Sequence, residues 1–188
     1  MDIADQTAAR TRIITWDDPA PRIAAAPTMS GLEFISAIAQ GKLPAPPIER
    51  LIDMGMGEVT EGHVVFTLQP GEQHYNPLGT VHGGIIATVL DSAMGCAIQT
   101  TLPMGKFFTT LEIKVNYIAA VLVSTGQLRC AAKVIHRGSR TATADGTIVD
   151  AKGRLIAHGS TTCMILDVPA KANPGANPGA KPSVKPGA

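Results

Sequence analysis

The residues with the clearest potential for chemistry lie between Asn76 and Gln99, in the stretch NPLGTVHGGIIATVLDSAMGCAIQ. Asp91 is the one charged residue of that stretch and interrupts an apolar helical pattern. A carboxylate in such a helix is costly to bury unless a partner pairs with it or a reaction uses it. Gly83 and Gly84 open the predicted helix, where backbone N–H groups are available to an approaching oxygen. The combination is typical of a site that polarises a carbonyl group and holds a carboxylate two turns further on.

Each polar residue of this stretch also has a structural interpretation. His82 either contacts the reacting group or braces the loop, and bracing is the simpler role. Asn76 either holds a water molecule or starts a turn with Pro77. Asp91 fits catalysis and, equally well, an ion pair with an arginine across a subunit contact. The residues alone leave these alternatives open.

One long helix and a set of strands must position these residues. The apolar spacing predicts a helix over residues 83–101, ended by Pro103 and Gly105. Alternating apolar residues and turn signals predict two short strands within 58–69, around a turn at Glu61-Gly62, and further strands over 107–117, 126–137, 141–150 and 154–166. Long strands joined by tight turns after one helix indicate a meandering antiparallel sheet, hence an α+β fold.

The chain divides into three predicted regions: an N-terminal arm with a short helix (1–50), the main domain (51–168) and a tail (169–188). Residues 1–28 are expected to form an extended arm, with Trp16, Ile13 and Ile14 as anchors on the sheet or on a neighbour. The tail repeats NPGA and lacks large apolar residues, so it is predicted to be disordered.

The short helix within the first region has a clear start signal. Ser30 is followed three residues later by Glu33, which is the pattern of a capping box. Gly41 then provides a natural end.

Composition excludes several classes of protein. The 188 residues are 45% hydrophobic and 16% charged, which is typical of a folded domain, and the net charge of +1 argues against a nucleic-acid partner. No apolar run approaches the ~18 residues of a membrane span, and the N-terminus lacks the pattern of a signal peptide. The three cysteines form no C-x-x-C pair and the histidines have no metal-ligand spacing. A cytoplasmic protein without a metal or cofactor is therefore expected.

The pattern N-x-x-G-x-x-H-G-G-x-x-x-x-x-x-D, which begins at Asn76 and ends at Asp91, carries a family resemblance. Residues 58–164 resemble the hotdog-fold acyl-CoA thioesterases of the phenylacetate-degradation (PaaI) type. The resemblance implies a long central helix wrapped by an antiparallel β-sheet. It also implies a homodimer or homotetramer in which two sheets join edge to edge and each active site is shared between two subunits.

The resemblance also assigns roles to residues. It implies that Asp91 is the catalytic general base or nucleophile and that Gly83 is the oxyanion N–H donor. It implies that Asn76 and His82 orient water and thioester from the other subunit, and that Thr110 lies near the attacking water.

Two arginines, Arg137 and Arg140, flank a predicted tight turn. They either contact the phosphates of coenzyme A or simply form a solvated hairpin tip, which is the more common outcome for charged turns.

The expected activity is hydrolysis of an aromatic or medium-chain acyl-CoA to the free acid and coenzyme A. One alternative is a dehydratase or hydratase acting on acyl thioesters, although neither H-F-P-G nor D-x-N-P-x-H occurs in the chain. A non-catalytic acyl-CoA-binding protein is the other alternative, and such a protein would not need Asp91.

Overall fold

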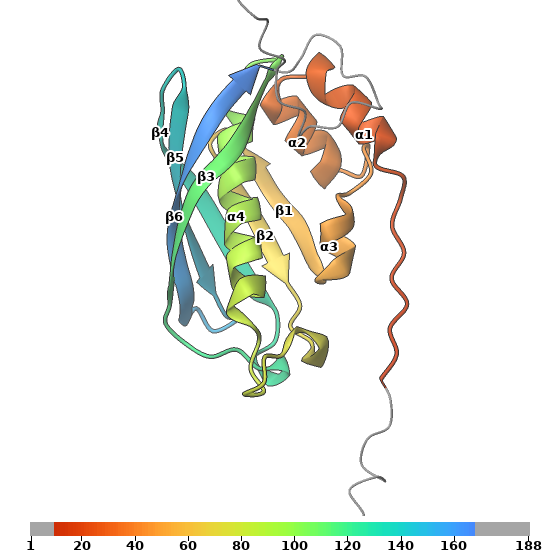
Figure 1. The fold of residues 1–188 in the computed structure, drawn as a ribbon, viewed down its shortest axis with the longest axis vertical. Helices are drawn as coiled ribbons and strands as arrows, with labels where there is room; N and C mark the ends of the chain where they lie inside the picture. Colours follow the sequence, from red (N-terminus) through yellow and green to blue (C-terminus); the bar gives the residue numbers. More distant parts are fainter. Residues whose placement is uncertain (1–9, 168–188) are drawn as a thin grey trace, which may run out of the picture.

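A long helix, α4 (Gly83–Thr100), lies against a six-stranded antiparallel sheet that curves around it (Figure 1). The computed structural model describes residues 10–167 of the chain, so the predicted tail lies outside the described residues. The predicted hotdog fold, a central helix wrapped by an antiparallel sheet, is confirmed. Within residues 10–167, no helix has the length and apolar character needed to cross a membrane.

The strands lie close to their predicted positions, but their order in the sheet differs from a meander. They are β1 (Met54–Thr60), β2 (His63–Leu68), β3 (Lys106–Tyr117), β4 (Leu128–Arg137), β5 (Thr141–Val149) and β6 (Leu155–Asp167). Their order in the sheet is β1-β2-β4-β5-β6-β3. The meander prediction holds for the consecutive pairs β1–β2, β4–β5 and β5–β6 and is wrong for β3, because α4 carries the chain across the face of the sheet between β2 and β3. As a result β3 pairs with β6 at the far edge, and β4 returns to pair with β2.

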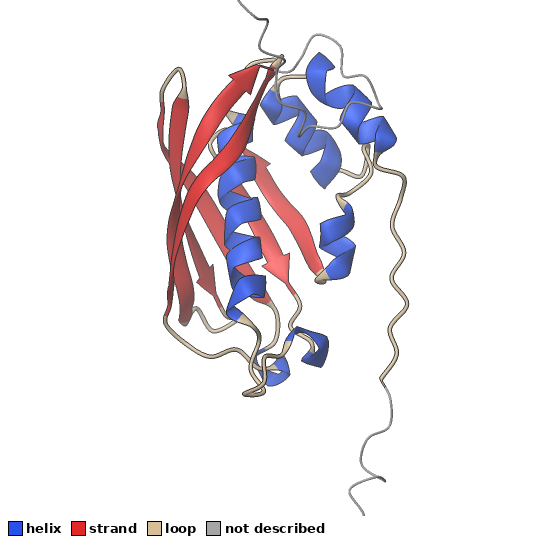
Figure 2. Ribbon diagram, viewed as in Figure 1, coloured by secondary structure: helices blue, strands red, loops and turns tan. Residues whose placement is uncertain are grey.

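Three short helices gather on one side of the molecule, where α2 contacts β1 and α4, and α3 contacts β1 (Figure 2). They are α1 (Ala20–Ala25), α2 (Gly31–Ala39) and α3 (Pro47–Leu51), and a 3-10 turn (Ala26–Thr28) follows α1. The capping box of α2 is present: the Ser30 hydroxyl accepts a hydrogen bond from Glu33 N at 3.3 Å, and the Glu33 carboxylate accepts one from Ser30 N at 2.9 Å.

The expectation of a fully extended arm is wrong for residues 20–28, which are helical. Alanine has the highest helix propensity, and Pro21 is tolerated in the first turn. Asp18 supplies an acceptor at the start of α1, where its Oδ1 accepts a hydrogen bond from Ala20 N at 2.9 Å.

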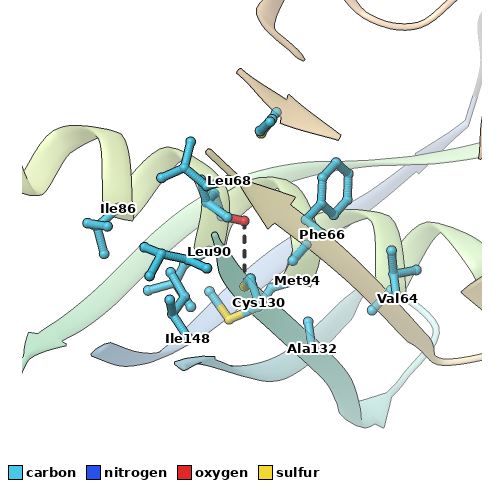
Figure 3. Packing of buried hydrophobic residues seen from close by; sticks show 14 of the residues in the cluster. Val64, Phe66, Leu68, Ile86, Leu90, Met94, Cys130, Ala132 and Ile148 are labelled. Atoms are coloured by element: carbon cyan, nitrogen blue, oxygen red, sulfur yellow. Dashed lines mark hydrogen bonds between the residues drawn. The ribbon is translucent and has the colours of Figure 1, made fainter. Parts of the chain in front are cut away.

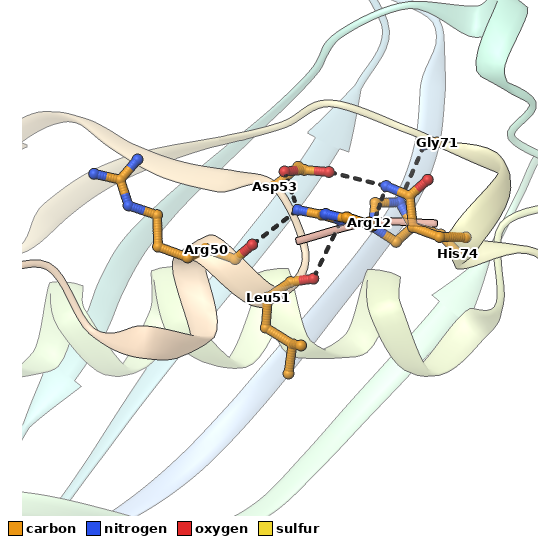
Figure 4. Close-up of polar contacts among 7 residues, drawn as sticks. Arg12, Arg50, Leu51, Asp53, Gly71 and His74 are labelled. Atoms are coloured by element: carbon orange, nitrogen blue, oxygen red, sulfur yellow. Dashed lines mark hydrogen bonds and ion pairs between the residues drawn. The ribbon is translucent and has the colours of Figure 1, made fainter. Parts of the chain in front are cut away.

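The extended residues of the arm are held by polar contacts (Figure 4). The Arg12 guanidinium donates to Asp53 Oδ1 at 2.5 Å and to Arg50 O at 2.9 Å. Ile13 and Trp16, the expected apolar anchors, are 87% and 61% exposed in the single chain. Anchoring of these two residues on the sheet is therefore not observed, and their contact with a neighbouring chain stays a prediction.

The core fills the space between α4 and the sheet (Figure 3). From α4, Leu90 and Met94 are fully buried against Phe66 of β2 and Cys130 of β4. Burial raises the pKa of the Cys130 thiol to about 12, so this cysteine is an unreactive part of the core. These residues fix one side of α4 on the sheet, and Asp91 does not belong to this core cluster.

Candidate functional site

His82 caps the start of α4. Its Nδ1 accepts a hydrogen bond from Gly84 N at 2.9 Å, and its backbone is extended, as an N-cap residue requires. The Gly84 N–H group is therefore occupied by the protein itself, which corrects the expectation that both glycines offer a free donor. Among the described residues, Gly83 N–H has no acceptor. One backbone donor, rather than two, is left unpaired at the helix start.

Tyr117, at the end of β3, packs over the same helix start. Its hydroxyl donates to Gly83 O at 3.1 Å, and its ring atoms lie 3.2 Å from where a Cβ at position 83 would be. A cavity of about 240 Å³ between Gly83, Ile86 and Tyr117 opens beside the helix start. No local pattern could have indicated this tyrosine, because the contact joins residues 34 positions apart.

Asn76 orders the loop that leads to His82. Its Oδ1 accepts hydrogen bonds from Leu78 N at 2.9 Å and Thr80 N at 3.3 Å, while its Nδ2 donates to Thr80 Oγ1 at 3.0 Å. This is an Asx-type turn, as the Asn-Pro pair predicts. The side chain is engaged within its own loop, and its role toward a water molecule stays a prediction.

The arm reaches this loop through a chain of contacts (Figure 4). Asp53, the ion-pair partner of Arg12, accepts a hydrogen bond from Gln73 Nε2 at 2.9 Å. The next residue, His74, is buried, and its carbonyl accepts from His82 N at 2.7 Å. Burial lowers the pKa of His74, so the neutral imidazole is favoured in the folded chain. The arm therefore supports the segment that positions the start of α4.

Asp91 lies in the middle of α4 and is half-buried. The hydroxyl of Thr110 on β3 donates to its Oδ1 at 2.9 Å. The register of β3 against β6 shifts between Thr110 and Glu112, where Leu111 forms a bulge and is 54% exposed. Within residues 10–167, no basic side chain forms an ion pair with Asp91. The structure thus brings together two residues that the resemblance placed in one site.

The helix start and Asp91 are separated along α4. Eight residues lie from Gly83 to Asp91, which corresponds to about 12 Å at the ~1.5 Å rise per residue of an α-helix. Reacting atoms must approach to about 3–3.5 Å. Gly83 N–H and the Asp91 carboxylate of one chain are therefore too far apart to contact one carbonyl group directly.

A second cavity, of about 380 Å³, lies beside Asp91. Its walls come from α4, from β1–β3 and from the N-terminal helices, and they are largely apolar, with Phe66, Phe107 and Phe108 among them. The sequence did not predict this cavity, because helices outside the main domain close it.

Arg137 and Arg140 lie at the β4–β5 hairpin, and both are exposed. In the part of the chain that the structure describes, neither takes part in an ion pair. Their proposed contact with coenzyme A stays a prediction. The same part of the chain contains no cluster of three or more His, Cys, Asp or Glu residues able to hold a metal ion.

Comparison with known proteins relates the central part of this chain to thioesterases. Residues 78–157, which include Gly83, Asp91 and Thr110, match the family model of the thioesterase superfamily. Acyl-coenzyme A thioesterase 13 of Mus musculus is 30% identical over 92 residues, which are 48% of this chain and 64% of the relative. The match thus spans slightly less than two thirds of that protein.

Two solved structures share the fold. The PaaI protein of the E. coli phenylacetic acid degradation operon superposes with a TM-score of 0.63 at 19% identity, covering 73% of this chain and 96% of that one. The protein smu.793 of Streptococcus mutans, solved with acetyl-CoA bound, has a TM-score of 0.56 at 25% identity, covering 61% and 89%. Residues 78–157 therefore match the thioesterase superfamily, in agreement with the resemblance found in the sequence, and the chain shares its hotdog fold with the PaaI protein.

Proposed function

We propose that this protein is an acyl-CoA thioesterase that hydrolyses an aromatic or medium-chain acyl-CoA to the free acid and coenzyme A. The observation that carries the proposal is the Asp91 carboxylate, which accepts a hydrogen bond from Thr110 and borders a largely apolar cavity. Such a cavity suits an acyl group, and the carboxylate at its wall suits a base for water. The acetyl-CoA bound to the Streptococcus mutans neighbour supports coenzyme A as the carrier.

In the proposed reaction, Asp91 takes a proton from water as the water oxygen attacks the thioester carbon. The negative charge that grows on the carbonyl oxygen is stabilised by the Gly83 N–H group and the positive end of α4. Collapse of this intermediate breaks the C–S bond, and the coenzyme A thiolate takes up a proton. Direct attack by Asp91, through an anhydride that water then hydrolyses, is the second possible route and gives the same products.

The separation of about 12 Å between Gly83 and Asp91 along α4 favours a site shared by two chains. The helix start of one chain would then face the Asp91 of its partner. The β3 edge is the proposed contact, since Tyr117 at its end and Ile118 directly after it are 56% and 54% exposed in the single chain. We therefore propose at least a homodimer joined along β3.

A thiol-release assay over a panel of acyl-CoAs tests the function. Asp91→Asn should lower kcat by about 10² to 10⁴ while the far-UV circular dichroism and the melting temperature stay close to wild type. Asp145→Asn, which makes the same change at an exposed position on β5, is the matched control and should retain full activity. Full activity in Asp91→Asn, or no hydrolysis of any acyl-CoA by the wild-type protein, would contradict the proposal.

A further inference from the structure

Glu49 on α3 is a buried carboxyl group without a complete set of partners. Glu49 is only 7% exposed, and its Oε1 has no hydrogen-bond partner among the described residues. Burial raises the pKa of Glu49 to about 7, against the opposing effect of Arg22 and Arg50. A buried acceptor that lacks a donor is destabilising, so its retention suggests that something else satisfies it.

Arg22 on α1 lies close enough to influence Glu49 but does not bind it. Its Nη1 donates to Pro44 O at 3.2 Å, and its positive charge lowers the pKa of Glu49. No ion pair within 4.0 Å joins the two side chains in the described part of the chain. Partial burial lowers the pKa of Arg22 itself. The Arg22 guanidinium and the Glu49 carboxyl group are thus near each other but form no ion pair.

Both side chains line the cavity that borders Asp91. Cys96 of α4 also lines it, and burial together with the charges of Glu49 and Asp91 raises the pKa of its thiol to about 12. Asp91, Cys96 and Glu49 thus line one and the same cavity. Most of the other residues that line this cavity are apolar.

Phe108 forms part of that apolar wall because α4 has a glycine opposite it. A Cβ at Gly95 would lie only 2.4 Å from the Phe108 ring. The glycine allows the aromatic ring, which lines the cavity, to pack directly on the helix.

We infer that this cavity binds the acyl group with its thioester at Asp91, and that Glu49 and Arg22 bind a hydroxyl group at the far end of the acyl chain. The inference rests on the proposed function. A hydroxyl group can donate to Glu49 and accept from Arg22 at once, which neither an ammonium nor a carboxylate group can do. An ammonium group would be repelled by Arg22, and a carboxylate group by Glu49 in its charged form.

The helices that carry Glu49 and Arg22 lie outside the region that matches the family model. Glu49 and Arg22 belong to α3 and α1, whereas the thioesterase superfamily model matches residues 78–157. The specificity is therefore assigned to the N-terminal helices, which are added to the hotdog domain at the cavity wall.

The test compares hexanoyl-, octanoyl- and decanoyl-CoA with their ω-hydroxy derivatives. For the chain length that fills the cavity, the wild-type protein should hydrolyse the hydroxylated substrate with a kcat/KM about tenfold higher, mainly through KM, since one hydrogen bond to a charged group is worth about that factor. Glu49→Leu should abolish or reverse this preference, measured within the variant as the ratio of kcat/KM for the hydroxylated and the unsubstituted substrate. Glu49→Gln, which keeps a donor and an acceptor, should keep part of the preference.

Glu61→Leu is the matched control, since it makes the same change at the exposed β1–β2 turn and should leave the preference unchanged. If the wild-type protein shows no preference at any length, or if Glu49→Leu keeps it, the inference is wrong while hydrolysis of the unsubstituted substrates still supports the proposed function. If no acyl-CoA is hydrolysed, the proposed function fails and the inference fails with it.

Discussion

At the scale of single residues, the Thr110–Asp91 hydrogen bond is the contact on which the proposed chemistry depends. The Thr110 hydroxyl fixes one oxygen of Asp91 and leaves the other available to a water molecule. Thr110→Val keeps the shape but removes the donor, so kcat should fall by about tenfold or more. Thr110→Ser should retain most of the activity. Steady-state kinetics decide the matter, and a Thr110→Val protein as active as Thr110→Ser would show that the hydroxyl is dispensable.

Glu49 should make stability depend on pH. Its pKa is raised from 4.5 to about 7 in the folded chain. The folded state therefore holds a proton that the unfolded state has lost between these two values, and the free energy of unfolding decreases as pH rises through this window. The loss is on the order of 3 kcal/mol, since each pKa unit corresponds to about 1.4 kcal/mol.

Denaturant unfolding of wild type and Glu49→Gln from pH 4 to pH 8 measures this effect. The wild-type protein should lose stability relative to the variant between pH ~4.5 and ~7. The lowered pKa of His74 acts with the opposite sign, because that stability is lost as pH falls, and the comparison with the variant cancels it. Parallel stability curves for the two proteins would be inconsistent with a buried carboxyl group at position 49.

At the scale of elements, the start of α2 is packed against the end of α4 at a position that only glycine fits. Gly31 N donates to Leu102 O at 2.9 Å, and a Cβ on Gly31 would lie 1.7 Å from Gln99 O. Because the obstacle is backbone, Gly31→Ala should force α2 away from α4 and lower the free energy of unfolding by about 2 kcal/mol or more.

Gly55→Ala on β1 serves as the control, since its Cβ would meet its nearest atom at an ordinary 3.7 Å. Thermal and denaturant unfolding of both variants test the prediction. Equal stability of Gly31→Ala and Gly55→Ala would mean that the junction of the N-terminal helices with α4 is looser than the structure indicates.

At the scale of the whole molecule, the proposed sharing of sites predicts that two inactive proteins rescue each other. Asp91→Asn lacks the carboxylate, and Asn76→Ala loses the turn that orders the loop before the start of α4. In an equal mixture with subunit exchange, half of the dimers are mixed and each has one intact site. Activity should therefore return to about a quarter of the wild-type value.

Light scattering establishes the assembly, and the thiol-release assay before and after exchange measures the rescue. Mixing Asp91→Asn with itself is the control. A monomer in solution, or no gain of activity after verified exchange, would place the complete site within one chain.

The sequence by itself determined the features that depend on local patterns. Apolar periodicity predicted α4 to within one residue, and the Ser30–Glu33 pair predicted the cap of α2, because each signal lies within a few residues of the chain. The order of residues around the start of α4 also carried the family resemblance. Alternation of apolar residues and tight turns predicted the strands and the hairpin pairs β1–β2, β4–β5 and β5–β6, but not the place of β3.

Only the tertiary structure decided which distant residues meet. The place of β3 at the far edge of the sheet follows from the crossing of α4, and this crossing brings Thr110 to Asp91 and Tyr117 to Gly83. The unpartnered Glu49 beside the same cavity had no local signal, since a glutamate in a short helix is usually solvated. Strand pairing and burial depend on the folding of the whole chain, so spacing along the sequence cannot determine them.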